Sequence, residues 1–211
     1  MSTMTQKSID EFLDRLASSD PTPGGGSAAA IMGATGAALV SMVCNVSIGK
    51  KGCEAAEPEL RAVLEKSEAL RRRLSAMVED DVAAFDALMA AYKLAKLTED
   101  DKAKRAEAIQ ASLRRATQVP LDCARACAEA IALARRAGER GYQQVISDAG
   151  VAVSAAHAAL RSAALNVFIN APALKDRGFA AEAVAEIDRL LRLAATESEA
   201  IYALVRAKLG G

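Results

Sequence analysis

Residues 21–49 read PTPGGGSAAAIMGATGAALVSMVCNVSIG, and this stretch decides the fold. Its prolines and its three successive glycines end any preceding helix, and no charged residue follows from Ser27 to Gly49. The uncharged run is long enough to cross a membrane, but its many Ala, Gly and Ser residues favour a helix that is buried in protein and closely packed by its neighbours. We therefore predict a central helix over residues 27–49, with Lys50 and Lys51 at its C-terminal end, where cations suit the helix dipole.

Helical periodicity continues through the rest of the chain, and no alternating strand pattern occurs. Ser8 and Glu11 form a capping box that begins a short helix, and a long helix that begins at Thr98 is expected to kink or break near Pro120. A second nearly uncharged helix follows Ser147 and Asp148. The predicted helices cover residues 8–18, 27–49, 57–95, 98 to 138–141 with the interruption at 120, 149–169 and 180–209.

These patterns predict an all-α protein, a single-domain bundle over residues 1–211 in which long amphipathic helices surround two buried uncharged helices. The uncharged helix surfaces also suit contact between copies of the chain, because faces rich in Ala and Gly pack well against copies of themselves. The two interpretations are compatible, and the sequence leaves both open.

Composition excludes several classes of function. Lys plus Arg and Asp plus Glu both number 27, aromatic residues make up 3%, and Trp is absent, so nucleic acid is a poor candidate partner. Four cysteines and one histidine, without the spacing of a zinc site, favour small buried side chains over a metal. The N-terminal residues contain no apolar run of a signal peptide, so we expect a cytoplasmic protein with no membrane span.

Gly24, Gly25 and Gly26, together with Ser27, form the first candidate binding site. Glycines ahead of a helix leave backbone N–H groups unshielded, and such groups favour a carboxylate, a phosphate or a polarised carbonyl. No Gly-Lys-Ser/Thr follows and no strand precedes, so the motif is neither a P-loop nor a dinucleotide fingerprint. The alternative is a tight turn in which Ser27 or a glycine caps the helix.

Two carboxylates are candidates for catalysis. Asp81 interrupts an apolar stripe between Met77 and Phe85, so we expect it to be buried or to face a pocket, where a raised pKa suits proton transfer. Its alternative role is an ordinary residue at the edge of the stripe that reaches solvent or an arginine. Asp148 begins the second uncharged helix, where a cap or a first-turn acid is the plain explanation.

Four further residues are candidates for substrate binding. Asn45 and Asn166 lie on the two uncharged helices, where a buried amide needs a partner from another helix or from a ligand. Lys50 and Lys51 suit an anionic substrate, although lysines at helix ends are common. His157 lies alone on an Ala-rich face, which is more typical of a core histidine than of a catalyst.

Taken together, these motifs resemble the cyclodeaminase/cyclohydrolase family, which includes the C-terminal domain of formiminotransferase-cyclodeaminase and stand-alone methenyltetrahydrofolate cyclohydrolases. The similarity runs from Ser8 to Leu209, nearly the whole chain. It rests on PTPGGGS (21–27), GKK (49–51), DVAAF (81–85), SDAGV (147–151) and NVFIN (166–170). Tyr142 departs from the pattern, because the family often carries Asn after the glycine at 141. The resemblance implies an all-helical homodimer that acts on a tetrahydrofolate derivative.

The resemblance leaves two reactions open. Hydrolysis of 5,10-methenyltetrahydrofolate to 10-formyltetrahydrofolate is favoured, because a cyclodeaminase needs a partner domain to supply formiminotetrahydrofolate and no such domain is present here. Closure of formiminotetrahydrofolate with release of ammonia is the alternative. A helical dimer that only binds folate, or serves as a structural partner, is the non-enzymatic alternative.

For hydrolysis, the hypothesis gives each candidate a role and requires neither metal nor cofactor. Asp81 takes the proton of the attacking water and returns it to N5. Asp148 balances the substrate cation or binds the pterin ring. The glycine amides and Ser27 hold the ligand, and Lys50 with Lys51 meets the glutamate carboxylates.

Overall fold

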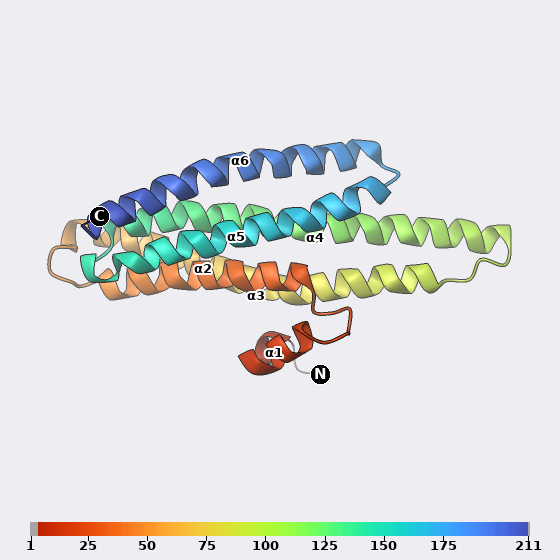
Figure 1. Cartoon of the computed structure of the whole chain (residues 1–211), viewed down its shortest axis with the longest axis horizontal. Helices are drawn as coiled ribbons and strands as arrows, with labels where there is room; N and C mark the ends of the chain where they lie inside the picture. Colours follow the sequence, from red (N-terminus) through yellow and green to blue (C-terminus); the bar gives the residue numbers. More distant parts are fainter. Residues whose placement is uncertain (1–3, 211) are drawn as a thin grey trace.

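Six α-helices account for most of the described residues, 4–210, of the computed structural model (Figure 1). They are α1 (Ile9–Leu16), α2 (Gly25–Ser47), α3 (Glu57–Lys93), α4 (Glu99–Arg140), α5 (Ile146–Asn170) and α6 (Arg177–Lys208). Short 3₁₀ turns are η1 (Met4–Gln6), η2 (Glu54–Ala56), η3 (Gln143–Val145) and η4 (Ala171–Ala173). The described range contains no strand, so the all-α prediction is confirmed. Residues 1–3 and 211, which the predicted domain and the expectation about the N-terminus include, lie outside that range.

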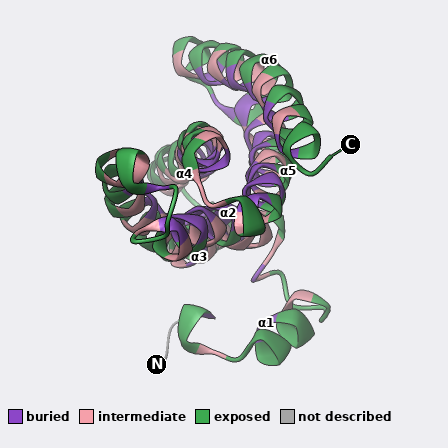
Figure 2. Ribbon diagram, turned by 90° about the vertical axis from the view of Figure 1, so that its left-hand side faces the viewer, coloured by how far each residue is buried: buried purple, intermediate pink, exposed green. Residues whose placement is uncertain are grey.

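The long helices form a bundle of four with a fifth on its outside. α2, α3, α4 and α5 pack in a ring, and α6 lies against α4 and α5 (Figure 1, Figure 2). α2 and α5 run antiparallel, because Gly25 lies near Asn166 whereas Gly36 contacts Ala152. α1 stands away from the bundle, near the beginning of α2 (Figure 1).

Both uncharged helices are core helices, as predicted. Large side chains of α2 and α5, among them Val40, Val43, Val153 and Leu160, are at most 1% exposed. Buried residues gather on the sides of the helices that face one another (Figure 2). α2 and α5 are also long and apolar enough to cross a membrane by length and composition, but here they pack against α3, α4 and each other. Each leaves one stripe exposed; the stripe of α2 is uncharged, and the stripe of α5 contains a single charged residue, Arg161.

The predicted break near Pro120 is wrong, because α4 continues without interruption from Glu99 to Arg140. A proline has no N–H to donate to the carbonyl four residues earlier, which here belongs to Ala116. Asn170 supplies the missing donor, since its Nδ2 donates to Ala116 O at 2.8 Å. Pro120 is itself buried, so its ring is packed and the freed carbonyl is satisfied.

Side-chain caps mark the beginning of α1, α4 and α6. Ser8 Oγ accepts the N–H of Glu11 at 3.0 Å, but the Glu11 carboxylate pairs with Lys7 and does not complete the predicted capping box. Asp176 accepts the N–H of Phe179 at 3.0 Å, so α6 begins three residues earlier than predicted. α5 also begins three residues early, at 146 rather than 149.

Candidate active site

The glycine-rich segment lies at the beginning of α2 and not in a loop before it. Gly24 is the N-cap, and Gly25 and Gly26 already belong to the first turn, so the expectation that all three precede the helix is wrong for the last two. Gly24 O accepts the N–H of Ala28 at 3.0 Å, and the N–H groups before Ala28 have no helical acceptor. These groups, at the positive end of the helix dipole, favour a negatively charged or polarised partner.

Asp81 of α3 meets this first turn. Ser27 Oγ donates to Asp81 Oδ2 at 2.8 Å, and Ser27 is fully buried. The other carboxylate oxygen fills the space beside Gly26, because a Cβ built on Gly26 would lie 2.0 Å from Asp81 Oδ1. Gly26 is therefore needed for the close approach of a carboxylate, a reason that only the packing of α2 on α3 reveals.

The surroundings of Asp81 raise the pKa of its carboxyl group. Burial raises the pKa of Asp81 above its ordinary value, and hydrogen bonds from the hydroxyl and the backbone of Ser27 oppose that rise. No charged neighbour contributes to the shift. The next residue, Asp80, is exposed. A half-buried carboxylate with a raised pKa and no cationic partner has the properties of a proton-transfer residue.

Asn166 of α5 lies next to the same turn. A Cβ built on Gly25 would lie 4.0 Å from Asn166 Nδ2. Asn166 is half-buried, and its Nδ2 donates to Ser162 O at 3.0 Å, which leaves its side-chain oxygen for a ligand. Helices α2, α3 and α5 thus bring the glycines, Ser27, Asp81 and Asn166 together.

The other predicted site residues lie at the opposite end of α2. Lys50 and Lys51 are exposed in the turn after the helix, Asn45 is exposed in its last turn, and Asp148 is half-buried in the first turn of α5. α2 contains 23 residues, and an α-helix rises about 1.5 Å per residue, so the two ends are roughly 30 Å apart. Within one chain the predicted residues therefore form two groups. The Asp81 group consists of Gly24, Gly25, Gly26, Ser27, Asp81 and Asn166, and the Lys50 group consists of Asn45, Lys50, Lys51 and Asp148.

Tyr142 lies beside the Lys50 group, although the sequence did not predict it as a site residue. Its backbone N–H donates to Ser47 Oγ at 2.7 Å, and Lys50 Nζ lies 5.9 Å from the centroid of its ring, within range of a cation–π contact. The turn that presents Lys50 needs glycines, since Gly49 and Gly52 have φ values of 75° and 92°. The departure from the family's usual Asn was the signal in the sequence that pointed to Tyr142.

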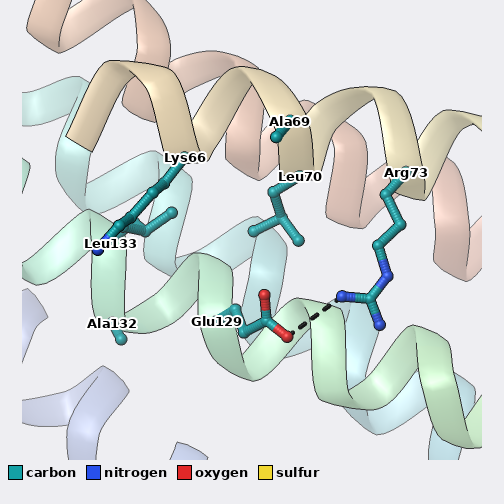
Figure 3. A pocket seen from close by; sticks show the side chains of 7 residues that line it. All are labelled: Lys66, Ala69, Leu70, Arg73, Glu129, Ala132 and Leu133. Carbon is teal, nitrogen blue, oxygen red and sulfur yellow. Dashed lines mark hydrogen bonds and ion pairs between the residues drawn. The ribbon is translucent and has the colours of Figure 1, made fainter. Parts of the chain in front are cut away.

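A separate groove lies between α3 and α4 and includes none of the predicted site residues (Figure 3). Its volume is about 410 Å³. Leu70 points into it, and Arg73 of α3 pairs with Glu129 of α4 at 3.2 Å across it (Figure 3). Its charged groups are this ion pair and Lys66, so the groove contains no unpaired carboxylate and offers less chemistry than the Asp81 group.

Within residues 4–210, no group of three or more His, Cys, Asp and Glu side chains is arranged to hold a metal ion. The four cysteines are free thiols, and all of them are buried. Burial raises the pKa of Cys44 to about 11, so its thiol stays protonated near neutral pH.

Comparison with known proteins identifies a family and a similar enzyme. The family model described as formiminotransferase-cyclodeaminase matches residues 8–189. A methenyltetrahydrofolate cyclohydrolase of Methylorubrum extorquens is 58% identical over 203 residues, which cover 96% of this chain and 98% of that protein.

Cyclodeaminases are similar at lower identity. A formimidoyltransferase-cyclodeaminase of Sus scrofa is 32% identical over 206 residues, which cover 98% of this chain but 38% of that longer protein. The crystal structure of a formiminotetrahydrofolate cyclodeaminase from Thermotoga maritima has a TM-score of 0.83 and 31% identity, covering 99% of this chain and 98% of that one. The helical architecture is therefore shared over nearly complete chains.

Proposed function

The chain belongs to the formiminotransferase-cyclodeaminase family, and on that premise we propose that it is a methenyltetrahydrofolate cyclohydrolase. Such an enzyme reversibly adds water to 5,10-methenyltetrahydrofolate and releases 10-formyltetrahydrofolate, a reaction of one-carbon metabolism. One observation carries the choice of reaction. The 58% identity to the Methylorubrum extorquens cyclohydrolase extends over 98% of that protein.

The proposed reaction depends on proton transfer. The methenyl carbon bridges N5 and N10 in a cationic amidine, so it is already electrophilic. A water oxygen bonds to this carbon and loses one proton. The bond from carbon to N5 then breaks as the carbonyl forms, N5 takes up a proton, and the second water proton is released to solvent. One carboxylate can serve both transfers, as general base and then as general acid, and such a group contributes about 10²–10⁴-fold to the rate.

We assign both proton transfers to Asp81. Its raised pKa brings its proton affinity nearer to neutral, and the Ser27 hydroxyl fixes the orientation of its carboxylate at 2.8 Å. Asp81 accepts the N–H of Ser27, and the N–H groups of residues 24–26 in the same turn suit a polar oxygen of the ligand. The side-chain oxygen of Asn166 supplies an acceptor on the other side of the same turn.

The Lys50 group is proposed to bind the rest of the folate. Lys50 and Lys51 are exposed cations and suit the carboxylates of the glutamate tail. Asp148 suits the positive charge of the substrate or a donor of the pterin ring, and the Asn45 amide suits either kind of hydrogen bond.

We further propose a homodimer in which each substrate site takes residues from both subunits. The adjacent helices α2 and α5 expose uncharged side chains, among them Thr35, Met42, Val151, Leu165 and Ile169. Such a face suits contact with its own copy. A two-fold axis near the middle of α2 would bring the Lys50 group of one subunit to the Asp81 group of the other, although the groups lie roughly 30 Å apart within one chain.

The proposed location is the cytoplasm, and the proposed partners are the folate substrate and a second copy of the chain. The two apolar helices support this location because both pack in the protein core. Equal numbers of basic and acidic residues, 27 each, argue against a nucleic-acid partner.

The decisive experiment follows the loss of methenyltetrahydrofolate absorbance with purified protein beside a control without enzyme, because this substrate also hydrolyses spontaneously. We expect clear acceleration, and we expect Asp81→Asn to reduce it about 10²–10⁴-fold. The matched control is Asp80→Asn, which changes the exposed neighbour and should keep full activity.

Each negative result has a definite meaning. Absence of acceleration by the wild-type protein contradicts the proposed hydrolysis. If Asp81→Asn is folded, by circular dichroism and melting temperature, and still turns over at the wild-type rate, Asp81 is not the proton-transfer residue.

A second candidate activity is the cyclodeaminase reaction. The near-complete structural match to the Thermotoga maritima cyclodeaminase favours it, since one fold then serves both reactions. Incubation with formiminotetrahydrofolate, with ammonia release and methenyltetrahydrofolate absorbance as readouts, separates the two activities. Binding of folate without turnover in either assay supports a folate-binding helical dimer.

A further inference from the structure

A small polar pocket lies between α5 and α6, away from the Asp81 group. Its volume is about 230 Å³, and its polar side chains include His157 and Arg161 from α5 and Ser198, Glu199 and Tyr202 from α6. Pockets for drug-sized ligands usually have roughly 300–1,000 Å³. The volume therefore suits a small metabolite and is too small for a complete folate.

Ser198 in this pocket lacks a hydrogen-bond partner. The residue is 7% exposed, and its Oγ is the one buried side-chain N or O atom without a partner in the part of the chain that the structure describes. Leaving a buried hydroxyl unpaired destabilises the fold, and buried polar groups are nearly always satisfied by protein, water or ligand. That oxygen exposes less than 1 Å², so a group in the pocket does not reach it, and the unpaired hydroxyl is a local destabilisation of α6.

Arg161 and Glu199 line the pocket from facing helices but form no ion pair within the described residues. The contact between α4 and α6 is different, because there Arg135 pairs with Glu197 at 2.7 Å. Burial, and then the charge of Arg161, lower the pKa of His157, so the imidazole stays neutral near pH 7 and adds no second positive charge. The pocket thus presents one unpaired cation and one unpaired anion.

We propose that this pocket binds a small zwitterion of the α-amino-acid class. The carboxylate of the ligand pairs with the guanidinium of Arg161, which can donate two parallel hydrogen bonds. The ammonium of the ligand pairs with Glu199. A simple anion would meet repulsion from Glu199 and a simple cation would meet repulsion from Arg161, so a ligand with both charges fits best.

The pocket is distinct from the proposed substrate site. His157 and Asn166 are nine residues apart on α5, which separates them by about 13 Å along the axis and places them on opposite faces of the helix. The exposed stripe proposed for the dimer includes Val151, which lies about 120° around α5 from His157. Arg161 lies one turn before Leu165 and about 40° from it around the helix, so it stands at the edge of the stripe proposed for the dimer.

Calorimetric titration and thermal unfolding with glycine, L-alanine and L-serine test this proposal. No folate is present, so the outcome is independent of the proposed reaction. We expect saturable binding and a higher melting temperature with at least one of these amino acids. We expect neither effect with N-acetylglycine, which lacks the ammonium, or with glycinamide, which lacks the carboxylate. The proposal is overturned if none of the three amino acids binds saturably, or if the blocked compounds bind equally well.

Variants connect the binding to the pocket. Arg161→Met and Glu199→Gln should each weaken binding about tenfold or more, whereas Arg192→Met, at an exposed position elsewhere on α6, should leave it unchanged. Ser198→Ala should raise the melting temperature of the ligand-free protein by about 2–4 °C and leave the affinity unchanged. Wild-type affinity in both Arg161→Met and Glu199→Gln would contradict the proposal.

Discussion

Asp81 links the stability of the fold to the proposed chemistry through one titrating group. Burial raises its pKa in the folded chain, whereas an aspartate in an unfolded chain titrates near about 3.9. Between these two values the folded protein holds a proton that the unfolded chain has lost. The contribution of Asp81 to stability therefore falls as the pH rises through this interval, and the cost of the buried charge persists above it.

Replacement of this carboxylate should change the pH dependence of stability. Asp81→Asn has no charge to bury, so we expect its free energy of unfolding to exceed that of the wild type near pH 7. The difference should shrink as the pH falls through the raised pKa toward about 4. Urea unfolding at a series of pH values measures it. A wild-type protein that gains stability over the variant as the pH rises would contradict this account.

Gly26 is the residue through which the backbone of α2 accommodates that carboxylate. A Cβ at this position would lie 2.0 Å from Asp81 Oδ1, so Gly26→Ala must displace the carboxylate. A misplacement of about 1 Å can cost about 10²-fold in rate, and we expect a loss of that order in the cyclohydrolase assay.

The matched control for Gly26→Ala is Gly178→Ala. Gly178 also follows an N-cap by two residues, but a Cβ there would meet Asp176 Oδ1 at an ordinary 3.4 Å. We expect this variant to keep wild-type activity. If Gly26→Ala is equally active, the position of Asp81 is not set by the first turn of α2.

The contact between α2 and α5 depends on a glycine at its centre. A Cβ on Gly36 would lie 3.0 Å from Ala152 O and 3.2 Å from Ala156 N, and backbone atoms cannot move aside as a flexible side chain can. We expect Gly36→Ala to reduce the free energy of unfolding by about 1–3 kcal/mol, measured by urea denaturation.

Gly138→Ala is the comparison for this contact. In α4, a Cβ on Gly138 would meet its nearest neighbours at 3.6 Å, so alanine should fit and should stabilise the helix by about 0.4–1 kcal/mol. Equal stability changes in Gly36→Ala and Gly138→Ala would show that the two helices tolerate a wider separation.

At the scale of the whole molecule, the proposed dimer is tested by placing a charge on the exposed face of α2 and α5 that is proposed as its interface. Met42 is 38% exposed on α2, and Met42→Glu would bury an unpaired carboxylate in the interface, a change that destabilises association. We expect light scattering to detect dimers for the wild type and monomers for the variant. Activity should fall with the dimer, because each proposed site takes residues from both subunits.

The control variant is Leu97→Glu, because Leu97 is 89% exposed at the turn between α3 and α4, away from α2 and α5. It should remain dimeric and active. A monomeric wild type would contradict the proposed dimer, and a monomeric Met42→Glu with full activity would contradict the shared site.

The sequence by itself determined the helical class and the approximate limits of the helices. Apolar spacing, caps and uncharged runs act within a turn or two of the chain, so they can be interpreted without knowing what packs where. The same local signals predicted that Asp81 is partly buried with a raised pKa, because a carboxylate within an apolar stripe is unusual wherever the stripe lies. They also pointed to the glycines, although not to the fact that Gly25 and Gly26 are helical.

Tertiary structure decided what depends on residues far apart in the sequence. α4 passes Pro120 because Asn170 supplies a donor from another helix, and Gly26 is required because Asp81 approaches it from α3. The candidate residues are divided between the two ends of α2 because an α-helix of 23 residues is long and rigid. Such pairings follow from which helix faces pack together, and local periodicity does not contain that information.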